Sequence, residues 1–189
     1  MTHHVRHRGN DHRKVFIDEE DCLRYLELLR GACAKYAVDV HNFALMKTHS
    51  HVLLTPPLGV SLSNAMREVG RGYSRAFNRK YRRRGTLWHG PYECKEVIDE
   101  EQALTCARYI EQNPVRAKVV SRLEDYRWSS YRIHALGEPS EWIVPHPAYI
   151  ALGKTAEDRQ AAFRALCAEP LPSSDILVVR WPRYVTRLN

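Results

Sequence analysis

Long apolar runs, a secretion signal and paired cysteines are all missing from this sequence. No apolar stretch approaches the ~18 residues that a membrane-spanning helix needs, and the first residues, MTHHVRHRGN, lack the apolar core of a signal peptide. The five cysteines are odd in number, widely spaced and without a Cys-x-x-Cys pair, which argues against a disulfide framework and a zinc knuckle. We therefore expect a cytoplasmic protein with reduced thiols.

Acidic residues are in deficit. The chain carries 22 Asp and Glu against 29 Lys and Arg, so its formal net charge is +7 and its sequence pI is about 9.3. This balance favours a polyanionic partner over a neutral small molecule. Lysine supplies only 7 of the basic residues, and the rest are arginine, whose planar guanidinium suits phosphate. With 189 residues, 44% of them hydrophobic, the chain can bury a core without cross-links.

Hydrophobic periodicity predicts alternating strands and helices over the first 120 residues. Apolar positions recur every three or four residues in some segments, while others are β-branched or apolar throughout. Two of the latter, joined by Lys47 and Thr48, predict a tight antiparallel hairpin. The expected elements are a short strand at 5–7, helices at 18–37 and 62–77, hairpin strands at 38–46 and 49–55, a strand within 85–98, and a helix at 99–114 that ends before Pro114.

This order, βαββαβα, predicts the α+β fold class. Its first six elements match the ferredoxin-like split βαβ arrangement, in which an antiparallel sheet carries two helices on one face. The seventh element is an added helix. We expect residues 1–120 to form one domain and residues 121–189 a C-terminal extension. Within the extension, the aromatic-rich segment 124–137 should pack on the core, 157–168 should be helical, and the tail from Glu169 should be irregular.

The segment HSHVLLT places His49 and His51 at the start of a predicted strand. Residues two apart on a strand point to the same face, with Cα atoms ~6.6 Å apart, so the two imidazoles could hold one metal ion. The pair alone is weak evidence for a metal site, because ten histidines in 189 residues give roughly 0.5 such pairs by chance, although histidine is a common metal ligand.

Arginines recur every four residues along the predicted helix that follows. Between residues 61 and 90 there are eight Arg or Lys and one acid, Glu68. Positions four apart drift by ~40° at each step, so they form a slowly winding stripe that can follow a phosphate backbone. A solvated helix face is an equally good reading of the charges alone. The candidate DNA-binding residues are Arg67, Arg71, Arg75, Arg79, Arg82 and Arg83.

Tyr109 and Asn113 lie one turn apart at the end of the last predicted helix of the first domain. A phenol and a carboxamide oxygen on the same helix face could reach one site. Each residue also has an ordinary structural explanation, since tyrosine on an amphipathic helix is usually half-buried and Asn before Pro commonly ends a helix.

Four ordered blocks give the sequence a family resemblance. They are RGN at 8–10, LMKTHSHVLLTP at 45–56, RYIEQNPVRAKVV at 108–120 and DYRWSSYR at 125–132. With these blocks the chain resembles the single-tyrosine transposases of the His-hydrophobic-His endonuclease superfamily, specifically the REP-associated tyrosine transposases, from about His3 to Ala151. It departs from them at Ser50, where the family prefers an apolar residue. Ser50 should point away from the metal-binding face, so its effect should fall on packing.

The resemblance implies a mechanism and its residues. It implies that His49, His51 and Asn113 bind Mg²⁺ or Mn²⁺ and that Tyr109 is the nucleophile. The implied enzyme is a metal-dependent transposase and endonuclease of the nucleoid that nicks and rejoins single-stranded hairpin DNA with palindromic repeats through a 5′-phosphotyrosine. It would act as a monomer or a weak dimer.

Two other functions remain open from the sequence. A non-catalytic protein of the same fold could bind hairpin DNA with the arginine stripe and would need neither the metal nor Tyr109. An RNA-binding module is the weaker alternative, because a ferredoxin-like sheet with basic helices also serves RNA, but the aromatic motif of such modules is missing from HSHVLLT.

Overall fold

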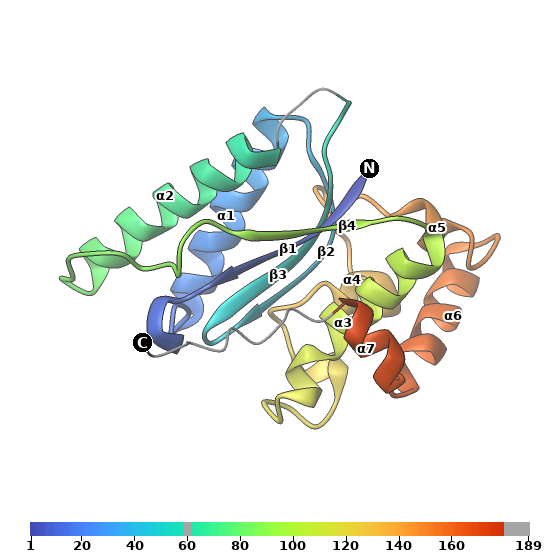
Figure 1. Cartoon of the computed structure of the whole chain (residues 1–189). Helices are drawn as coiled ribbons and strands as arrows, with labels where there is room; N and C mark the ends of the chain where they lie inside the picture. Colours follow the sequence, from blue (N-terminus) through green and yellow to red (C-terminus); the bar gives the residue numbers. More distant parts are fainter. Residues whose placement is uncertain (59–61, 180–189) are drawn as a thin grey trace.

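The structure, a computed structural model, describes residues 1–58 and 62–179 and is built around a four-stranded antiparallel sheet (Figure 1). The strand order is β2-β3-β1-β4, which confirms the ferredoxin-like prediction. The strands are β1 Thr2–Arg8, β2 Asp39–Met46, β3 His49–Thr55 and β4 Glu93–Val97. The helices are α1 Glu19–Lys35, α2 Leu62–Lys80, α3 Glu100–Arg116, α4 Tyr131–Leu136, α5 Pro147–Ile150, α6 Ala156–Ala168 and α7 Ser173–Val179, with short 3-10 turns at Asn10–His12 and Leu123–Asp125. None of the described helices is long and apolar enough to cross a membrane.

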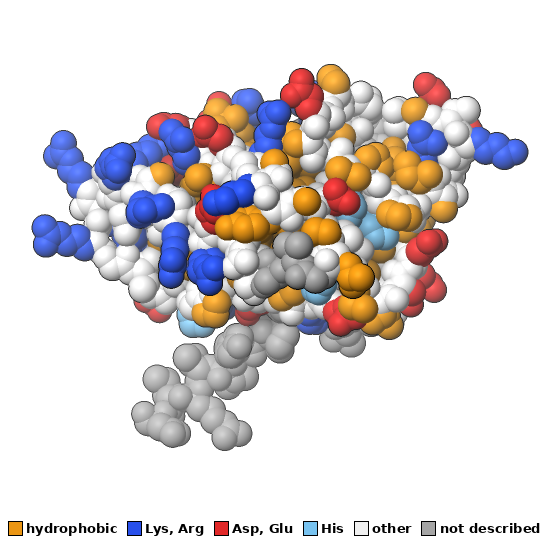
Figure 2. Space-filling model, turned by 90° about the horizontal axis from the view of Figure 1, so that it is seen from above, with side chains coloured by type: hydrophobic (Ala, Val, Ile, Leu, Met, Phe, Trp, Pro, Cys, Tyr) orange, Lys and Arg blue, Asp and Glu red, His pale blue; other side chains and the backbone are white. Residues whose placement is uncertain are grey.

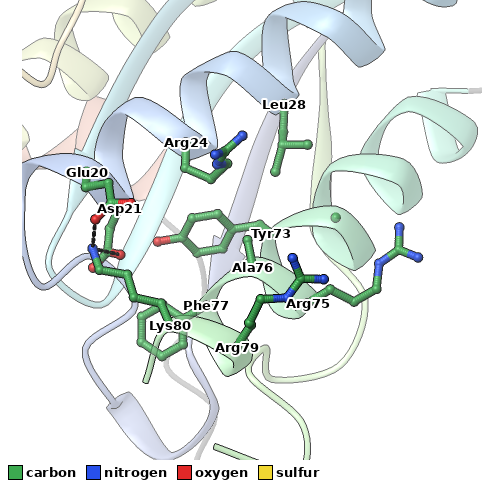
Figure 3. A pocket seen from close by; sticks show the side chains of 11 residues that line it. Glu20, Asp21, Arg24, Leu28, Tyr73, Arg75, Ala76, Phe77, Arg79 and Lys80 are labelled. Carbon is green, nitrogen blue, oxygen red and sulfur yellow. Dashed lines mark hydrogen bonds and ion pairs between the residues drawn. The ribbon is translucent and has the colours of Figure 1, made fainter. Parts of the chain in front are cut away.

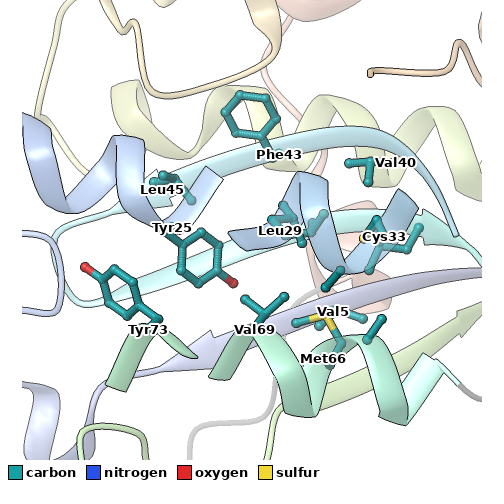
Figure 4. Packing of buried hydrophobic residues seen from close by; sticks show 14 of the residues in the cluster. Val5, Tyr25, Leu29, Cys33, Val40, Phe43, Leu45, Met66, Val69 and Tyr73 are labelled. Atoms are coloured by element: carbon teal, nitrogen blue, oxygen red, sulfur yellow. The ribbon is translucent and has the colours of Figure 1, made fainter. Parts of the chain in front are cut away.

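Helices α1 and α2 pack on one face of the sheet and on each other. α1 begins at a reciprocal cap, in which the Asp18 side chain accepts from the Asp21 N–H and Asp21 accepts in return from the backbone of Asp18. Side chains such as Tyr25, Leu29 and Val69 fill the space between these helices and the sheet (Figure 4). This apolar layer fixes the position of the sheet relative to α2.

Helix α3 packs on the opposite face of the sheet, against β2 and β3, and the C-terminal extension surrounds it (Figure 1). A second buried cluster joins residues from both sides of residue 120, including Ile110 on α3 and Phe163 on α6. α3 is therefore held between the sheet and the extension.

The extension also covers the outer edge of β2. The Leu45 N–H donates to the Trp128 carbonyl at 2.9 Å, the Ser130 N–H donates to the Phe43 carbonyl at 3.0 Å, and the Val144 N–H donates to the Val40 carbonyl at 2.9 Å. These bonds satisfy backbone groups that an edge strand otherwise leaves open. The aromatic-rich segment thus packs on the core, as expected.

Two expectations about the helices are wrong. α3 does not stop before Pro114 but continues to Arg116, because tertiary packing on both sides of α3 offsets the lost N–H bond and the ring clash that proline introduces into a helix. Part of the tail expected to be irregular forms α7, a short helix that sequence periodicity misses and that packs against α3. Residues 180–189 lie outside the described part of the chain.

Candidate active site

β3 carries His49 and His51 on the sheet face that α3 covers. Their ring centroids are 4.9 Å apart and the ring planes are perpendicular, at 89°. Ser50 points to the opposite face, where its hydroxyl lies 2.8 Å from the hydroxyl of Tyr25 on α1. The period of the strand therefore separates the two imidazoles from the apolar layer, as expected from the sequence.

Both histidines present a nitrogen suited to a metal. Burial lowers the pKa of His49 to about 4, with help from Arg6 and Arg8, and it lowers the pKa of His51 well below its ordinary value. Both rings are therefore neutral at pH 7, which is the form that binds metals. Nδ1 of His49 lies 3.0 Å from the Thr48 hydroxyl, and Nδ1 of His51 lies 2.8 Å from Nε2 of His4. These contacts engage the two Nδ1 nitrogens, so a metal ion would have to approach the Nε2 nitrogens.

α3 brings Tyr109 to the same place. The tyrosine ring is buried, and its centroid lies 5.6 Å from that of His51 in an edge-to-face arrangement. The guanidinium of Arg116, two turns further along α3, lies 4.7 Å from the centre of the Tyr109 ring. The structure thus joins two sequence-predicted residues that are 58 positions apart, and it adds a cation over the phenol.

Asn113 is oriented by the backbone of α3. Its side-chain N–H donates to the Tyr109 carbonyl at 3.0 Å, so the amide oxygen faces away from that carbonyl and is available to a cation. Within residues 1–58 and 62–179, no hydrogen bond joins Asn113 to either histidine, and no three His, Cys, Asp or Glu side chains are grouped to hold a metal. Two neutral imidazoles and an amide oxygen can hold a divalent cation, with the remaining positions left to water and phosphate, and the imidazoles suit a transition ion better than Mg²⁺, which prefers oxygen ligands.

His4, which the sequence reasoning missed, completes the buried group. It lies on β1, is 1% exposed, and its ring centroid is 5.0 Å from that of His51 and 6.0 Å from that of Tyr109. Burial lowers its pKa to about 3, so it is also neutral. The sequence signal was the histidine-rich start MTHHVRH, but only the pairing of β1 with β3 shows which of these histidines meets the site.

Glu111 fixes α3 from its other side. Its carboxyl accepts hydrogen bonds from the Asn42 side chain on β2, at 2.8 Å, and from the hydroxyl of Ser130 in the extension. Burial raises the pKa of Glu111 to about 7, against the opposing effect of these donors. This residue therefore ties the tyrosine helix to both of its neighbours.

The arginine stripe lies on α2, on the far side of the sheet from Tyr109. Arg67, Arg71, Arg75 and Arg79 are exposed on the helix, as is Arg82 just after it. Lys and Arg side chains gather at the end of the molecule that holds the second half of α2 (Figure 2). Arg83 differs, because its guanidinium donates to the Asn78 side chain at 2.8 Å and stabilises the loop that follows.

Two grooves flank the stripe. One, of about 840 Å³, lies between α2 and the segment 85–92, and it combines Arg67, Arg71 and Arg75 with Trp88 and Tyr92. The other, of about 660 Å³, separates α1 from α2 (Figure 3). There Lys80 is held by the carboxylates of Asp18, Glu20 and Asp21, whereas Arg75 and Arg79 extend from α2 at its rim. The first groove, which no carboxylate lines, is therefore the better place for an anionic ligand.

Comparison with known proteins identifies the family. Residues 1–113 match the family model described as "Transposase IS200 like". The chain belongs to the IS200-like transposase family. Among curated proteins no match was found. Membership implies a transposase or nuclease activity for this chain.

Two solved structures resemble this IS200-like transposase. The first is a REP-associated tyrosine transposase bound to a REP hairpin, at 15% identity and a TM-score of 0.64, covering 78% of this chain and 89% of that one. The second is a Deinococcus radiodurans R1 protein assigned as a transposase, at 16% identity and a TM-score of 0.45, covering 55% of this chain and 83% of that one. At these identities, the first likeness supports the fold of the transposase.

Proposed function

We propose that this transposase nicks and rejoins single-stranded hairpin DNA, with Tyr109 as the nucleophile. The observation that carries the proposal is the meeting of β3 and α3, which packs the Tyr109 ring edge-to-face against His51. The site is buried on a rigid sheet and helix, as the positioning of a nucleophile requires. Arg116 supports the same role, since its guanidinium over the Tyr109 ring could bind the phosphate that the phenol attacks.

The covalent step exchanges one phosphodiester for another. The phenol oxygen of Tyr109 forms a bond to phosphorus, the bond from phosphorus to the 3′ oxygen breaks, and the phenol proton ends on the released 3′ hydroxyl. The product is a 5′-phosphotyrosine that keeps the energy of the broken bond. Attack by a 3′ hydroxyl reverses the exchange and rejoins a strand without an external energy source.

A divalent cation would be held by Nε2 of His49, Nε2 of His51 and the amide oxygen of Asn113. Mg²⁺ or Mn²⁺, when bound, would polarise the scissile phosphate and stabilise the negative charge on the leaving oxygen. Both imidazoles are neutral, as metal binding requires, and their Nδ1 atoms contact Thr48 and His4.

The arginine stripe would hold the DNA. Its exposed guanidinium groups can follow phosphates, and the half-buried Tyr92 in the neighbouring groove offers a face for an unpaired base. The structural relative that covers most of this chain was captured with a REP hairpin, which makes a palindromic hairpin the first substrate to try.

The test is covalent capture. Incubation of the wild-type protein with Mn²⁺ and palindromic hairpin oligonucleotides, taken from the DNA on either side of its gene, should give a protein-DNA adduct that survives denaturation and is attached through the DNA 5′ end. Tyr109→Phe should abolish the adduct, because it removes one oxygen and keeps the ring. Its melting temperature and hairpin affinity should stay near those of the wild type.

Tyr131→Phe is the matched control for Tyr109→Phe. Tyr131→Phe removes the hydroxyl of another buried tyrosine, which lies in the extension, and should leave the adduct in place. An adduct that persists in Tyr109→Phe would mean that another residue is the nucleophile. Tight hairpin binding without any adduct in the wild type would instead favour a DNA-binding protein that lacks catalysis.

A further inference from the structure

The imidazole of His4 is held against His51 in a defined geometry. Nε2 of His4 lies 2.8 Å from Nδ1 of His51, and the two rings are tilted by 34°. The strand register produces this contact: Arg6 pairs with His51 and His4 pairs with Leu53, so His4 is the diagonal neighbour of His51 on the same face. Both side chains are buried, so the contact is sheltered from water.

A hydrogen bond between two neutral imidazoles carries a single proton, and its position decides what His51 can do. If the proton sits on Nε2 of His4, Nδ1 of His51 accepts, the His51 proton must occupy Nε2, and no lone pair remains for a metal. If the proton sits on Nδ1 of His51, His4 accepts and Nε2 of His51 is free to coordinate. Metal binding by His51 therefore requires His4 to be the acceptor.

We propose that His4 is a positioning residue that holds His51 in the tautomer and ring orientation required for metal binding through Nε2. The inference rests on the proposed metal site and adds to it a residue outside the three expected ligands. His4 is not a further ligand in this arrangement, because its Nε2 lone pair points at the Nδ1–H of His51. The same ring also contacts the edge of Tyr109, so it helps to set the distance between nucleophile and metal.

The position would otherwise favour an apolar residue. On β3 it pairs with Leu53, which is fully buried, and on β4 with Lys95, while the neighbouring second cluster is largely apolar. Burying an imidazole there costs free energy unless its polar atoms are paired. The hydrogen bond to His51 meets this requirement at Nε2 of His4.

The test measures Mn²⁺ affinity by isothermal titration calorimetry, without DNA and without a reading of activity. His4→Leu should weaken Mn²⁺ binding by about 10–100-fold, the range typical of lost outer-sphere partners. His4→Gln should stay within a few fold of the wild type, because its amide oxygen can accept from Nδ1 of His51. His7→Leu is the matched control: His7 is equally buried on β1 but faces the α2 side, so its loss should leave Mn²⁺ affinity unchanged.

His49→Ala separates failure of this inference from failure of the proposed function. If His49→Ala abolishes Mn²⁺ binding while His4→Leu binds like the wild type, the role of His4 is overturned and the metal site stands. If folded His4→Gln binds as weakly as His4→Leu, the acceptor role is overturned. If the wild type and His49→Ala bind Mn²⁺ equally, the metal site of the proposed function fails, and the inference fails with it.

A second measurement tests the proposal even if His4→Leu does not fold, because it uses only the wild-type protein. Nitrogen-15 NMR of the histidine rings in the wild-type protein loaded with Mg²⁺ reports which nitrogen of each ring carries hydrogen. The proposal expects a protonated Nδ1 on His51 and an unprotonated Nε2 on His4. The reverse pattern would overturn it.

Discussion

The two faces of the sheet bury different kinds of side chain. Towards α1 and α2 the sheet presents Val5, Val52 and Leu54, and Ser50 is paired with a tyrosine hydroxyl. Towards α3 it presents His4, His51 and Asn42, which are all buried and polar. Burial of polar groups weakens a fold unless each is paired, so the second face depends on the hydrogen bonds between His4 and His51 and between Asn42 and Glu111. The apolar face supplies the rigidity that this arrangement needs.

The helices that cover the two faces of the sheet also differ. The helix layer above the apolar face carries the arginine stripe, whereas the polar face is covered by α3 and the extension. The arginines proposed to bind DNA and the side chains proposed for catalysis thus lie on opposite sides of the sheet. A DNA molecule that uses both must have its hairpin and its cleavage site on different sides of the protein. The following predictions test this separation.

The largest effect should follow loss of an imidazole on the polar face. His49→Ala and His51→Ala should each reduce Mn²⁺-dependent nicking by at least about 100-fold, since a lost ligand should cost more than a lost outer-sphere partner. Hairpin affinity, measured by fluorescence anisotropy, should change by no more than a few fold. His134→Ala removes another buried imidazole and should retain nicking. Full nicking by both ligand variants would remove the histidines from the mechanism.

The next largest effect concerns the carboxyl of Glu111. Its pKa is about 7 in the folded protein and should be near 4.5 in the unfolded chain, so between these values the folded state binds more protons and stability falls as the pH rises. The loss should reach roughly 3 kcal/mol by pH 8. Glu111→Gln keeps acceptors for Asn42 and Ser130 but cannot ionise. Its free energy of unfolding by urea should exceed that of the wild type increasingly from pH 5 to 8.

A pH-independent difference between the two proteins would show that Glu111 ionises freely in the folded state. Glu157→Gln is the matched control, because Glu157 is exposed in the first turn of α6. It should not change the pH profile beyond a few tenths of a kcal/mol.

On the opposite side of the sheet, the arginine stripe should affect binding alone. Replacing Arg71, Arg75 and Arg79 together by Gln should weaken hairpin binding and reduce the log-log salt slope by about 0.7 for each lost contact with single-stranded DNA. Mn²⁺ affinity should not change. Gln at Arg30, Arg122 and Arg127, three exposed arginines in ion pairs elsewhere, removes the same charge and should alter the slope less. Equal slopes for the two triple variants would make the stripe an ordinary solvated surface.

The smallest effect is expected at Ser50. Ser50→Val leaves the Tyr25 hydroxyl buried without its partner and should cost about 1–3 kcal/mol of stability. Adding Tyr25→Phe should recover most of this cost, because an apolar pair replaces a hydrogen-bonded pair. Thermal unfolding of the wild type and of the single and double variants measures these changes in stability. Nicking should be unchanged throughout, and a loss of nicking in the folded double variant would show that the two faces are not separate.

Local patterns were enough to predict the sheet, the hairpin at Lys47 and Thr48 and the faces of α1 and α2, because strand and helix periods are properties of short segments. Alternation along β3 also predicted that Ser50 points away from the histidines. The roles of His4 and Glu111 were not predictable, since they depend on the register between β1 and β3 and on where the extension docks. α7 was missed for a similar reason: a helix of seven residues is set by its contacts more than by its sequence.

The hydrogen bonds along β2 bear on how this protein can change during evolution. The family match ends at residue 113, yet β2 takes backbone partners from Trp128, Ser130 and Val144, and α3 shares its core with residues as distant as Phe163. A segment bound in this way cannot be exchanged as a module. A graft of residues 121–179 from a relative would therefore have to reproduce the β2 edge and the partners of Glu111 together.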